Sequence, residues 1–335
     1  MSRNLASIRK IKEISPIEGA DTLECAKVDG WSVVVKKDAF KVGDLGVYFE
    51  IDSWIPHDLA PFLSKGKEPK VYNNIKGERL RTIKLRGQIS QGLLLPLNEL
   101  NLVENTYECL EGYDFTETLG IQKYESVDEA KISSNMAMKG NFPQFITKTH
   151  QERIQNIFDK LKPTWEVTEK LDGSSMTVYF KDGEIGVCSH NIEIKEDYDN
   201  SFWRVAKNDG IIEKLIEFGR NIAVQGELVG PSIQKNRYGL KQQTFYLFDI
   251  FDIDSKRHYL PYVRHQINEK LCLKHVPVIA RSTVLTDSLQ ELLLSAERKS
   301  VLCSESEQEG FVYKNEKNPH ESFKVISNKY LLSEQ

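Results

Sequence analysis

The first third of the chain is a series of short apolar runs, rich in β-branched and aromatic residues and separated by turn signals. The clearest runs are Ser32–Val35, Gly46–Phe49, Arg81–Leu85 and Gly92–Pro96. Runs of four or five such residues are too short for helices and are typical of strands. Residues 1–120 are therefore predicted to form a small antiparallel β-barrel or sandwich.

The pattern changes after residue 120. Residues 121–145 lose their periodicity and are predicted to form a linker, and residues 146–335 are predicted to form a second domain. In this domain predicted helices at Gly210–Gly219 and Asp287–Leu294 alternate with predicted strands at Thr177–Phe180 and Phe245–Ile250. Gly219 is expected to end the first helix, and Asp287 to cap the second. The chain as a whole is predicted to be α+β, with a mixed α/β second domain.

The apolar runs and the cysteines argue against a membrane protein and against a protein stabilised by zinc or disulfides. The formal net charge is −4. The opening residues lack the apolar core of a signal peptide and no apolar run is long enough to cross a bilayer, so we expect neither a signal peptide nor a membrane span. The five cysteines are scattered and none forms a CxxC pair, which argues against a zinc site or a disulfide framework. We expect an intracellular protein, cytoplasmic or nuclear, with no membrane partner.

A cationic stretch lies within the first domain. Eight lysines and arginines occur between Lys65 and Arg86, enough to touch several phosphates if they share a face. The candidate contacts are Arg79, Arg81, Lys84 and Arg86. A solvated charged surface is the alternative interpretation.

Lys170 is the strongest candidate for a reactive residue. It lies between two predicted strands and is followed by Asp172 and Gly173. A lysine at a strand end can attack phosphorus only as the free amine, so nearby cations or desolvation must lower its pKa. Asp172 and Gly173 are expected to supply a polar contact and a tight turn.

Five strings in order resemble the motifs of the covalent nucleotidyltransferases, which comprise DNA and RNA ligases and mRNA capping enzymes. Lys170–Gly173 resembles motif I, Gln225–Gln234 motif III, Phe245–Ile250 motif IIIa, Glu309–Lys314 motif IV and Ser322–Lys329 motif V. A lone KxDG string is weak, but five strings in family order are specific. The sequence around Glu227 and Phe248 is most similar to that of the RNA-ligase-2-like enzymes.

The N-terminal part indicates which group within this family the chain resembles. Ser15–Leu23 and Leu85–Leu93 resemble the tRNA-binding branch of OB-type barrels, and Phe145–Asn156 resembles the opening of the nucleotidyltransferase domain. An OB barrel before this domain is similar to the Naegleria-type RNA ligases. The resemblance implies an OB domain followed by an ATP-grasp-like ligase domain, in a monomer that seals nicked duplex RNA.

The resemblance also implies roles for particular residues. ATP and Mg²⁺ or Mn²⁺ are the implied cofactors, and Lys170 is the implied nucleophile that takes AMP. Phe248 is expected to stack on adenine and Lys324 to contact the α-phosphate, while Glu227, Glu309 and Asp172 are the metal candidates. The implied nucleotide-binding set is Lys170, Asp172, Gly173, Glu227, Phe248, Lys324 and Lys329.

Two positions depart from the family pattern. His190 stands where members usually carry arginine, and Ile326 stands where motif V often has a second lysine, which leaves Lys329 as the next cation. The contact of position 190 with the ribose or the 5′-phosphate is therefore in doubt. Lys148, Arg153 and His190 are retained as candidate phosphate or nucleic-acid contacts.

Other interpretations stay open at this point. Outside the family context, Phe248 would be a core residue, Glu227 and Glu309 surface carboxylates, and Lys324 a solvated lysine. A DNA ligase would share every motif, and a capping enzyme would use the same lysine with GTP, although capping enzymes usually place the OB domain last. From another class, the chain could be a non-catalytic nucleic-acid-binding protein.

Overall fold

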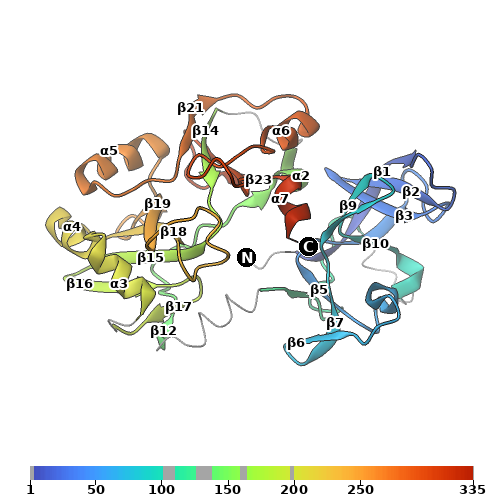
Figure 1. Ribbon diagram of the computed structural model, residues 1–335, viewed down its shortest axis with the longest axis horizontal. Helices are drawn as coiled ribbons and strands as arrows, with labels where there is room; N and C mark the ends of the chain where they lie inside the picture. Colours follow the sequence, from blue (N-terminus) through green and yellow to red (C-terminus); the bar gives the residue numbers. More distant parts are fainter. Residues whose placement is uncertain (1–3, 101–109, 126–137, 159–163, 197–199, 335) are drawn as a thin grey trace. The chain divides into compact units, whose positions relative to one another are not determined.

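The structure is a computed structural model that describes residues 4–100, 110–125, 138–158, 164–196 and 200–334. The chain divides into two compact units, drawn in Figure 1. The first unit comprises Met1–Glu125 together with Leu331–Gln335, and the second comprises Ser126–Tyr330.

The larger sheet of the first unit has the strand order β10-β4-β1-β2-β3. Its strands are β1 (Ala6–Pro16), β2 (Leu23–Val28), β3 (Trp31–Lys36), β4 (Leu45–Phe49) and β10 (Leu93–Pro96). The first half of β1 pairs with β4 and the second half with β2, and a bulge lies between Ile11 and Glu13. A bulge bends and twists a strand, which lets one strand serve two parts of a curved sheet. The strands predicted at 32–35, 46–49 and 92–96 are confirmed.

A smaller sheet and a hairpin complete this unit. The sheet has the order β11-β5-β7-β6, and the hairpin pairs β8 with β9. Their bounds are β5 (Ser53–Pro56), β6 (Lys70–Tyr72), β7 (Ile75–Arg79), β8 (Thr82–Leu85), β9 (Gln88–Gln91) and β11 (Gln122–Lys123), with short 3₁₀ helices η1 (Pro61–Ser64) and η2 (Leu97–Leu100). Arg86 and Gly87 both have positive φ, 48° and 83°. Two left-handed residues make the tight turn that matches the twist of a hairpin.

The predicted linker at 121–145 differs from the structure at both of its ends. Residues 122–123 form β11 against β5, and residues 138–141 form β12 (Met138–Asn141) against β17 (Ile192–Ile194). Strands of two to four residues are too short to show a periodicity, so only pairing with an existing sheet edge reveals them. Residues 126–137 lie outside the described residues.

The second unit contains a seven-stranded sheet of order β12-β17-β16-β15-β18-β19-β20. The remaining strands are β15 (Ser174–Lys181), β16 (Glu184–Cys188), β18 (Ile222–Val229), β19 (Thr244–Asp252) and β20 (Arg257–His258). One face packs its apolar residues, including Val178, Val224 and Leu247, against the helices α3 (Ser201–Asn208), α4 (Ile211–Phe218) and α5 (Pro261–Leu271). Figure 1 shows these helices along one side of the sheet.

The other sheet of this unit has the order β13-β23-β22-β14-β21. Its strands are β13 (Glu152–Arg153), β14 (Trp165–Lys170), β21 (Val278–Thr283), β22 (Gly310–Asn315) and β23 (Ser322–Ile326), and the helices beside it are α2 (Ile154–Ile157), α6 (Leu289–Ser295) and α7 (Asn328–Ser333). Trp165, Val167, Phe311, Tyr313 and Phe323 pack on one face with Ile154 and Leu292. Strand alternation therefore places Glu166, Thr168 and Lys170 on the opposite face.

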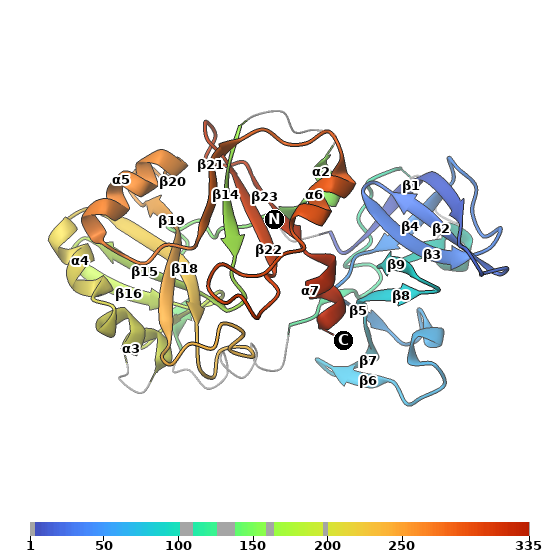
Figure 2. The same ribbon diagram turned by 45° about the horizontal axis from the view of Figure 1, so that its top comes forward.

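The two polar faces meet inside the second unit. Lys314 on β22 contacts Asp249 on β19 at 2.6 Å, and both side chains are more than nine-tenths buried. Figure 2 shows β15 and β18 of one sheet beside β14 and β22 of the other. The fold thus gathers polar side chains between two sheets whose outer faces form separate apolar cores.

Helix ends agree only partly with the sequence expectations. Helix α4 lies between Gly210 and Gly219, both with positive φ, and Gly219 caps its C-terminus as expected. At α6 the N-cap is Ser288, whose side chain accepts a hydrogen bond from the Glu291 amide. The predicted cap at Asp287 is therefore wrong by one residue, because two adjacent residues have capping side chains and only the backbone geometry selects between them.

No described helix combines the length and the apolar character that a bilayer crossing needs.

Candidate active site

Lys170 is the last residue of β14 and pairs with Gly310, the first residue of β22. This register puts Glu309, one residue before the strand, beside the lysine. The Lys170 Nζ atom lies 2.8 Å from each carboxylate oxygen of Glu309. About a quarter of the lysine side chain is exposed. An added Cβ on Gly310 would lie 2.1 Å from the carbonyl oxygen of Val325, so the strand packing requires glycine there.

The protonation of Lys170 differs from the sequence expectation. Burial lowers the pKa of its amine, but the carboxylates of Glu309, Glu227 and Asp172 outweigh burial and raise the pKa above its ordinary value. The predicted lowering is therefore wrong for this arrangement of charges. The motifs showed one cation and three acids near the lysine, but not that the acids would be the closer neighbours.

Glu227 reaches the site from the other sheet. It lies on β18 opposite Ser175 of β15 and Tyr246 of β19, and its charge acts on Lys170. The structure therefore brings together Lys170, Glu227 and Glu309 from three separate stretches of sequence. Lys324 joins them, because its charge lowers the pKa of Glu309, although burial of Glu309 has the larger, opposite effect.

The turn after Lys170 passes very close to β18. An added Cβ on Gly173 would lie 2.4 Å from the carbonyl oxygen of Leu228. Only glycine permits this approach. Asp172, in the same turn, pairs with Arg237 at 2.6 Å and is mostly buried. Its backbone amide donates a hydrogen bond to the hydroxyl of Tyr238 at 2.6 Å.

Phe248 occupies an irregular position in β19. Gln225 pairs with Asp249 and the next residue, Gly226, pairs with Leu247, so Phe248 is the extra residue of a β-bulge. Its ring is half-buried and packs in one cluster with Tyr246. The Nζ atom of Lys314 donates to the Phe248 carbonyl oxygen at 2.6 Å and lies 5.5 Å from the centre of the ring.

Of the two motif V lysines, only Lys324 lies near Lys170. Lys324 pairs with Val312 on β22, two residues from Gly310, and with Arg153 on β13. Lys329 instead lies 3.8 Å from Glu297, with 57% of its side chain exposed. This difference follows from the strand end at Ile326, after which the chain enters α7.

The remaining candidates of this unit have different surroundings. Arg153 is buried at the edge strand β13. Lys148 donates a hydrogen bond to the Asn191 side chain at 3.0 Å and lies over the Phe142 ring. His190 is exposed in the turn between β16 and β17.

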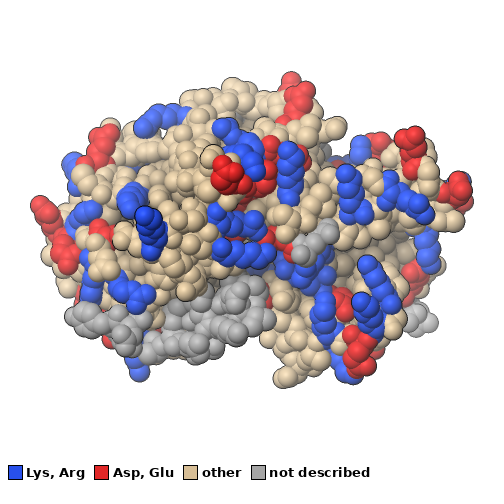
Figure 3. Space-filling model, in the orientation of Figure 1, with Lys and Arg blue, Asp and Glu red and all other residues tan. Residues whose placement is uncertain are grey.

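The four candidate cations of the first unit have two kinds of surroundings. Arg79 pairs with Asp52 at 2.6 Å and stacks on Tyr124, and Arg81 donates to the backbone carbonyl of Glu334. Lys84 and Arg86 lie exposed on the β8–β9 hairpin. Figure 3 shows lysine and arginine side chains spread over both units, with acidic residues between them.

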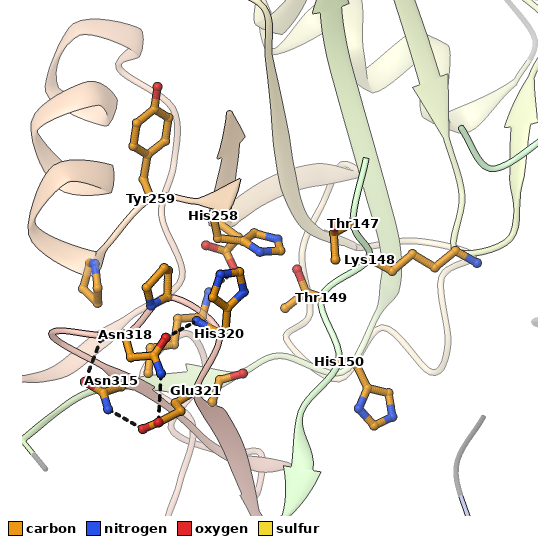
Figure 4. Close-up of a pocket in the computed structure, with 15 residues that line it drawn as sticks. Thr147, Lys148, Thr149, His150, His258, Tyr259, Asn315, Asn318, His320 and Glu321 are labelled. Carbon is orange, nitrogen blue, oxygen red and sulfur yellow. Dashed lines mark hydrogen bonds and ion pairs between the residues drawn. The ribbon is translucent and has the colours of Figure 1, made fainter. Parts of the chain in front are cut away.

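A cavity of about 190 Å³ lies in the second unit, away from Lys170. Its walls include Thr147–His150, Asp249, His258, Lys314 and the turn 318–322. In Figure 4, His258 and His320 lie close together, whereas Lys148 and His150 extend away from them. Gln225 holds one wall, because its amide donates to the carbonyl of Thr147 and its oxygen accepts from the Thr149 hydroxyl.

Four buried or partly buried polar residues of this region were missed as candidates from the sequence. Asp249 and Lys314 stand inside the quoted strings for motifs IIIa and IV, so their type and position were visible. Their pairing needed the bulge at Phe248. Arg237 and Tyr238 follow motif III in a stretch without periodicity, and no sequence signal connects them with Asp172.

The acids near Lys170 fit a hard divalent cation. No three His, Cys, Asp or Glu side chains in the described part of the chain are arranged to hold a metal ion by themselves. Mg²⁺ and similar ions keep several waters and take few protein ligands. Glu227 and Glu309 supply the carboxylate oxygens that such an ion prefers, whereas Asp172 is already paired with Arg237.

Two family models match the chain. A model described as an OB-fold domain matches residues 5–97, and a model described as RNA ligase matches residues 163–326. The predicted order, an OB domain followed by a ligase-type nucleotidyltransferase domain, is confirmed. No curated protein sequence matches the chain.

Solved structures of Naegleria gruberi RNA ligase are similar to this chain over nearly its whole length. A mutant with ATP and Mn is 44% identical, covers 98% of each chain and has a TM-score of 0.89. The ligase with pyrophosphate has the same identity and coverage and a TM-score of 0.90, and a mutant with AMP and Mn has a TM-score of 0.91. With 44% identity across 98% of both sequences, this chain belongs to the RNA ligase family that includes the Naegleria gruberi enzyme.

Proposed function

We propose that this chain is an ATP-dependent RNA ligase that joins 3′-hydroxyl and 5′-phosphate ends through a lysyl-AMP intermediate. The observation that carries the proposal is the meeting of Lys170, Glu309 and Glu227 between two sheets, in a chain of the RNA ligase family. The Naegleria gruberi relatives with ATP, AMP and pyrophosphate support the choice of nucleotide.

The proposed chemistry has three displacements at phosphorus. The Lys170 Nζ atom bonds to the α-phosphorus of ATP, and pyrophosphate leaves. A 5′-phosphate oxygen then bonds to the same phosphorus as the bond to Nζ breaks. In the last step the 3′-hydroxyl bonds to the 5′-phosphorus and AMP leaves, so a phosphodiester forms.

The charged residues of the site have different roles in these steps. Lys170 must lose a proton and separate from Glu309 before it attacks, because a protonated amine has no free electron pair. Glu309 and Glu227 would hold a divalent metal, which when bound neutralises charge on the phosphate oxygens. Lys324 adds a fixed cation on the same side of the sheet.

Phe248 is the proposed stacking partner for adenine. Its ring is partly exposed within an apolar cluster, and the Lys314 amine holds its backbone carbonyl. A flat apolar ring offers the base a matching π surface.

Nicked duplex RNA is the proposed substrate, and the monomer the proposed form. An OB-type domain that precedes a ligase domain in the sequence supports nucleic-acid binding in the first unit. DNA-containing ends remain the principal alternative, since the proposed chemistry does not involve the 2′-hydroxyl.

Covalent labelling tests the central step. The protein is incubated with Mn²⁺ and either α-labelled ATP or α-labelled GTP, denatured, and examined for label on the polypeptide. We expect label from ATP alone, and none with Lys170→Ala. Lys241→Ala, an exposed lysine in the same unit, serves as the matched control and should label like the wild type. Preference for GTP would indicate capping chemistry, and absence of label would indicate a binding protein.

A further inference from the structure

The segment between β18 and β19, residues 230–243, packs on the turn that follows the nucleophile. The Arg237 Nε atom lies 2.6 Å from Asp172 Oδ2. The Tyr238 hydroxyl accepts from the Asp172 amide at 2.6 Å, and Gln234 donates to the Gly173 carbonyl oxygen at 3.3 Å. Three contacts from this segment therefore fall on the two residues 172 and 173.

The 230–243 segment is itself held in one conformation. Gln243 donates to the Pro231 carbonyl and so ties the two ends together. The Asn236 side chain forms hydrogen bonds with both backbone groups of Leu240. Tyr238 is buried and packs beside Leu171, the first residue of the turn. Internal bonds of this kind let a loop act as a preformed support.

Arg237 is also held independently of Asp172. Its guanidinium lies 4.6 Å from the centre of the Tyr330 ring, at the start of α7. The Ser306 hydroxyl donates to its backbone carbonyl at 2.5 Å. The arginine is therefore fixed by contacts with two other parts of the second unit.

The turn needs such support because it lies between two strands. Strand β14 ends at Lys170 and β15 begins at Ser174, so residues 171–173 lack ladder hydrogen bonds. Asp172 also adds a third negative charge near Lys170, beside Glu227 and Glu309. A charge-assisted contact with a fixed guanidinium holds such a carboxylate in one orientation.

We propose that Arg237 and Tyr238 are positioning residues for lysine adenylylation, which hold the turn 171–173 so that Lys170 stays aligned with the α-phosphorus. They act through Asp172 and the turn. The proposal rests on the proposed function, because it assigns these residues to making and breaking the bond between Lys170 and AMP.

The test separates the lysine steps from the final sealing step. Self-adenylylation is measured as a function of ATP concentration, and sealing is measured separately on a nick that already carries AMP on its 5′ end. Arg237→Ala should lower kcat for self-adenylylation by about 10- to 100-fold, since a displacement near 1 Å can cost about 100-fold. Its KM for ATP and its sealing of the pre-adenylylated nick should stay within about threefold of wild type.

Conservative variants keep the test independent of folding. Arg237→Lys retains the charge but lacks the planar guanidinium, so it should recover part of the lost rate. Tyr238→Phe removes only the hydroxyl that accepts from the Asp172 amide, and we expect about a three- to tenfold loss in the same step. Lys241→Ala, in the same segment, is the matched control and should match the wild type.

Three results would overturn the assignment. The first is a wild-type self-adenylylation rate in Arg237→Ala, and the second is an equal loss in self-adenylylation and in sealing of the pre-adenylylated nick. The third is an Arg237→Lys variant as slow as Arg237→Ala. Failure of the proposed function is recognised separately, because the wild-type protein itself would then take no label from ATP.

Discussion

At the scale of single residues, one extra residue in β19 determines which side chains face the space between the two sheets. Regular alternation would put Asp249 on the same side of the sheet as Leu247, which is buried in the core beneath the helices. The bulge at Phe248 reverses the side of Asp249, so the carboxylate meets Lys314 instead of apolar side chains. Bulges often redirect side chains next to active sites in this way.

Replacement of Phe248 distinguishes base stacking from core packing. Phe248→Ala should raise KM for ATP in self-adenylylation at least about fivefold, because stacking of a base on an aromatic ring contributes about 1–3 kcal/mol. Phe248→Tyr keeps the ring and should stay within about threefold of the wild type. Initial labelling rates at varied ATP concentration measure the effect. A large loss of stability in urea unfolding together with an unchanged KM would show that the ring only packs in the core.

At the scale of elements, the tip of the β8–β9 hairpin is an exposed part of the first unit. Residues 83–87 are all exposed, including the apolar side chains of Ile83 and Leu85, at 39% and 37%. Lys84 and Arg86 lie on this tip, whereas Arg79 is tied to Asp52 and Tyr124. The four cations predicted as one phosphate-binding set therefore separate into two that contact other parts of this unit, Arg79 and Arg81, and two exposed ones, Lys84 and Arg86.

We predict that the hairpin cations contact phosphates and that Arg79 does not. Lys84→Ala and Arg86→Ala together should weaken nick sealing and reduce the slope of log affinity against log salt by about one unit for each lost contact. Self-adenylylation should not change, because it needs no nucleic acid. Arg79→Ala is the comparison variant, and it should lower stability without a change in the salt slope. Unchanged sealing affinity in the double variant would contradict a role for the hairpin.

At the scale of the whole molecule, a buried ionic cluster joins β14, α5 and the chain before β21. Arg264 is fully buried, contacts Glu166 and donates to His275 Nε2 at 3.1 Å. His265 also contacts Glu166. His275 Nδ1 lies 2.6 Å from the Val276 carbonyl oxygen, so the ring has one donating and one accepting nitrogen. A second proton on His275 would have to enter between Nε2 and the guanidinium.

This cluster predicts that the free energy of unfolding decreases as the pH falls. Burial and the Arg264 charge lower the pKa of His275 to about 3. Below pH 6.5 the unfolded chain therefore binds a proton at His275 that the folded chain does not. The free energy of unfolding should decrease by about 1.4 kcal/mol per pH unit from this group as the pH falls toward 3.

Glu166 also makes the free energy of unfolding decrease as the pH falls, but over a lower pH range. Burial alone would raise its pKa, but the hydrogen bond with His265 and the charge of Arg264 outweigh burial and lower the pKa to about 2. Its stabilisation is present above the unfolded pKa of 4.5 and is lost as the pH falls from there through about 2. Burial also lowers the pKa of His258, so urea unfolding at pH 7.5, 6 and 5 reports on both histidines. His275→Gln should show a shallower dependence, and the difference measures the share of His275. An equal slope in that variant would assign the effect to other groups.

The features that the sequence determined are those carried by neighbouring residues. Strand runs in the first 100 residues, the glycine-bounded helix α4 and the position of Lys170 at a strand end all depend on local pattern. The strings from 170 to 329 also sufficed for the family, because each motif is contiguous. These features need no knowledge of which strands pair.

The tertiary structure decided which of the candidates share one site. The register between β14 and β22 places Glu309 in contact with Lys170. Strand β23 ends before Lys329, which lies near Glu297 instead. The 230–243 segment brings Arg237 into contact with Asp172. The direction of the Lys170 pKa shift also follows from the distances to three acids. Distances and registers between remote segments arise from packing, and a one-residue bulge such as that at Phe248 changes them without any periodic trace in the sequence.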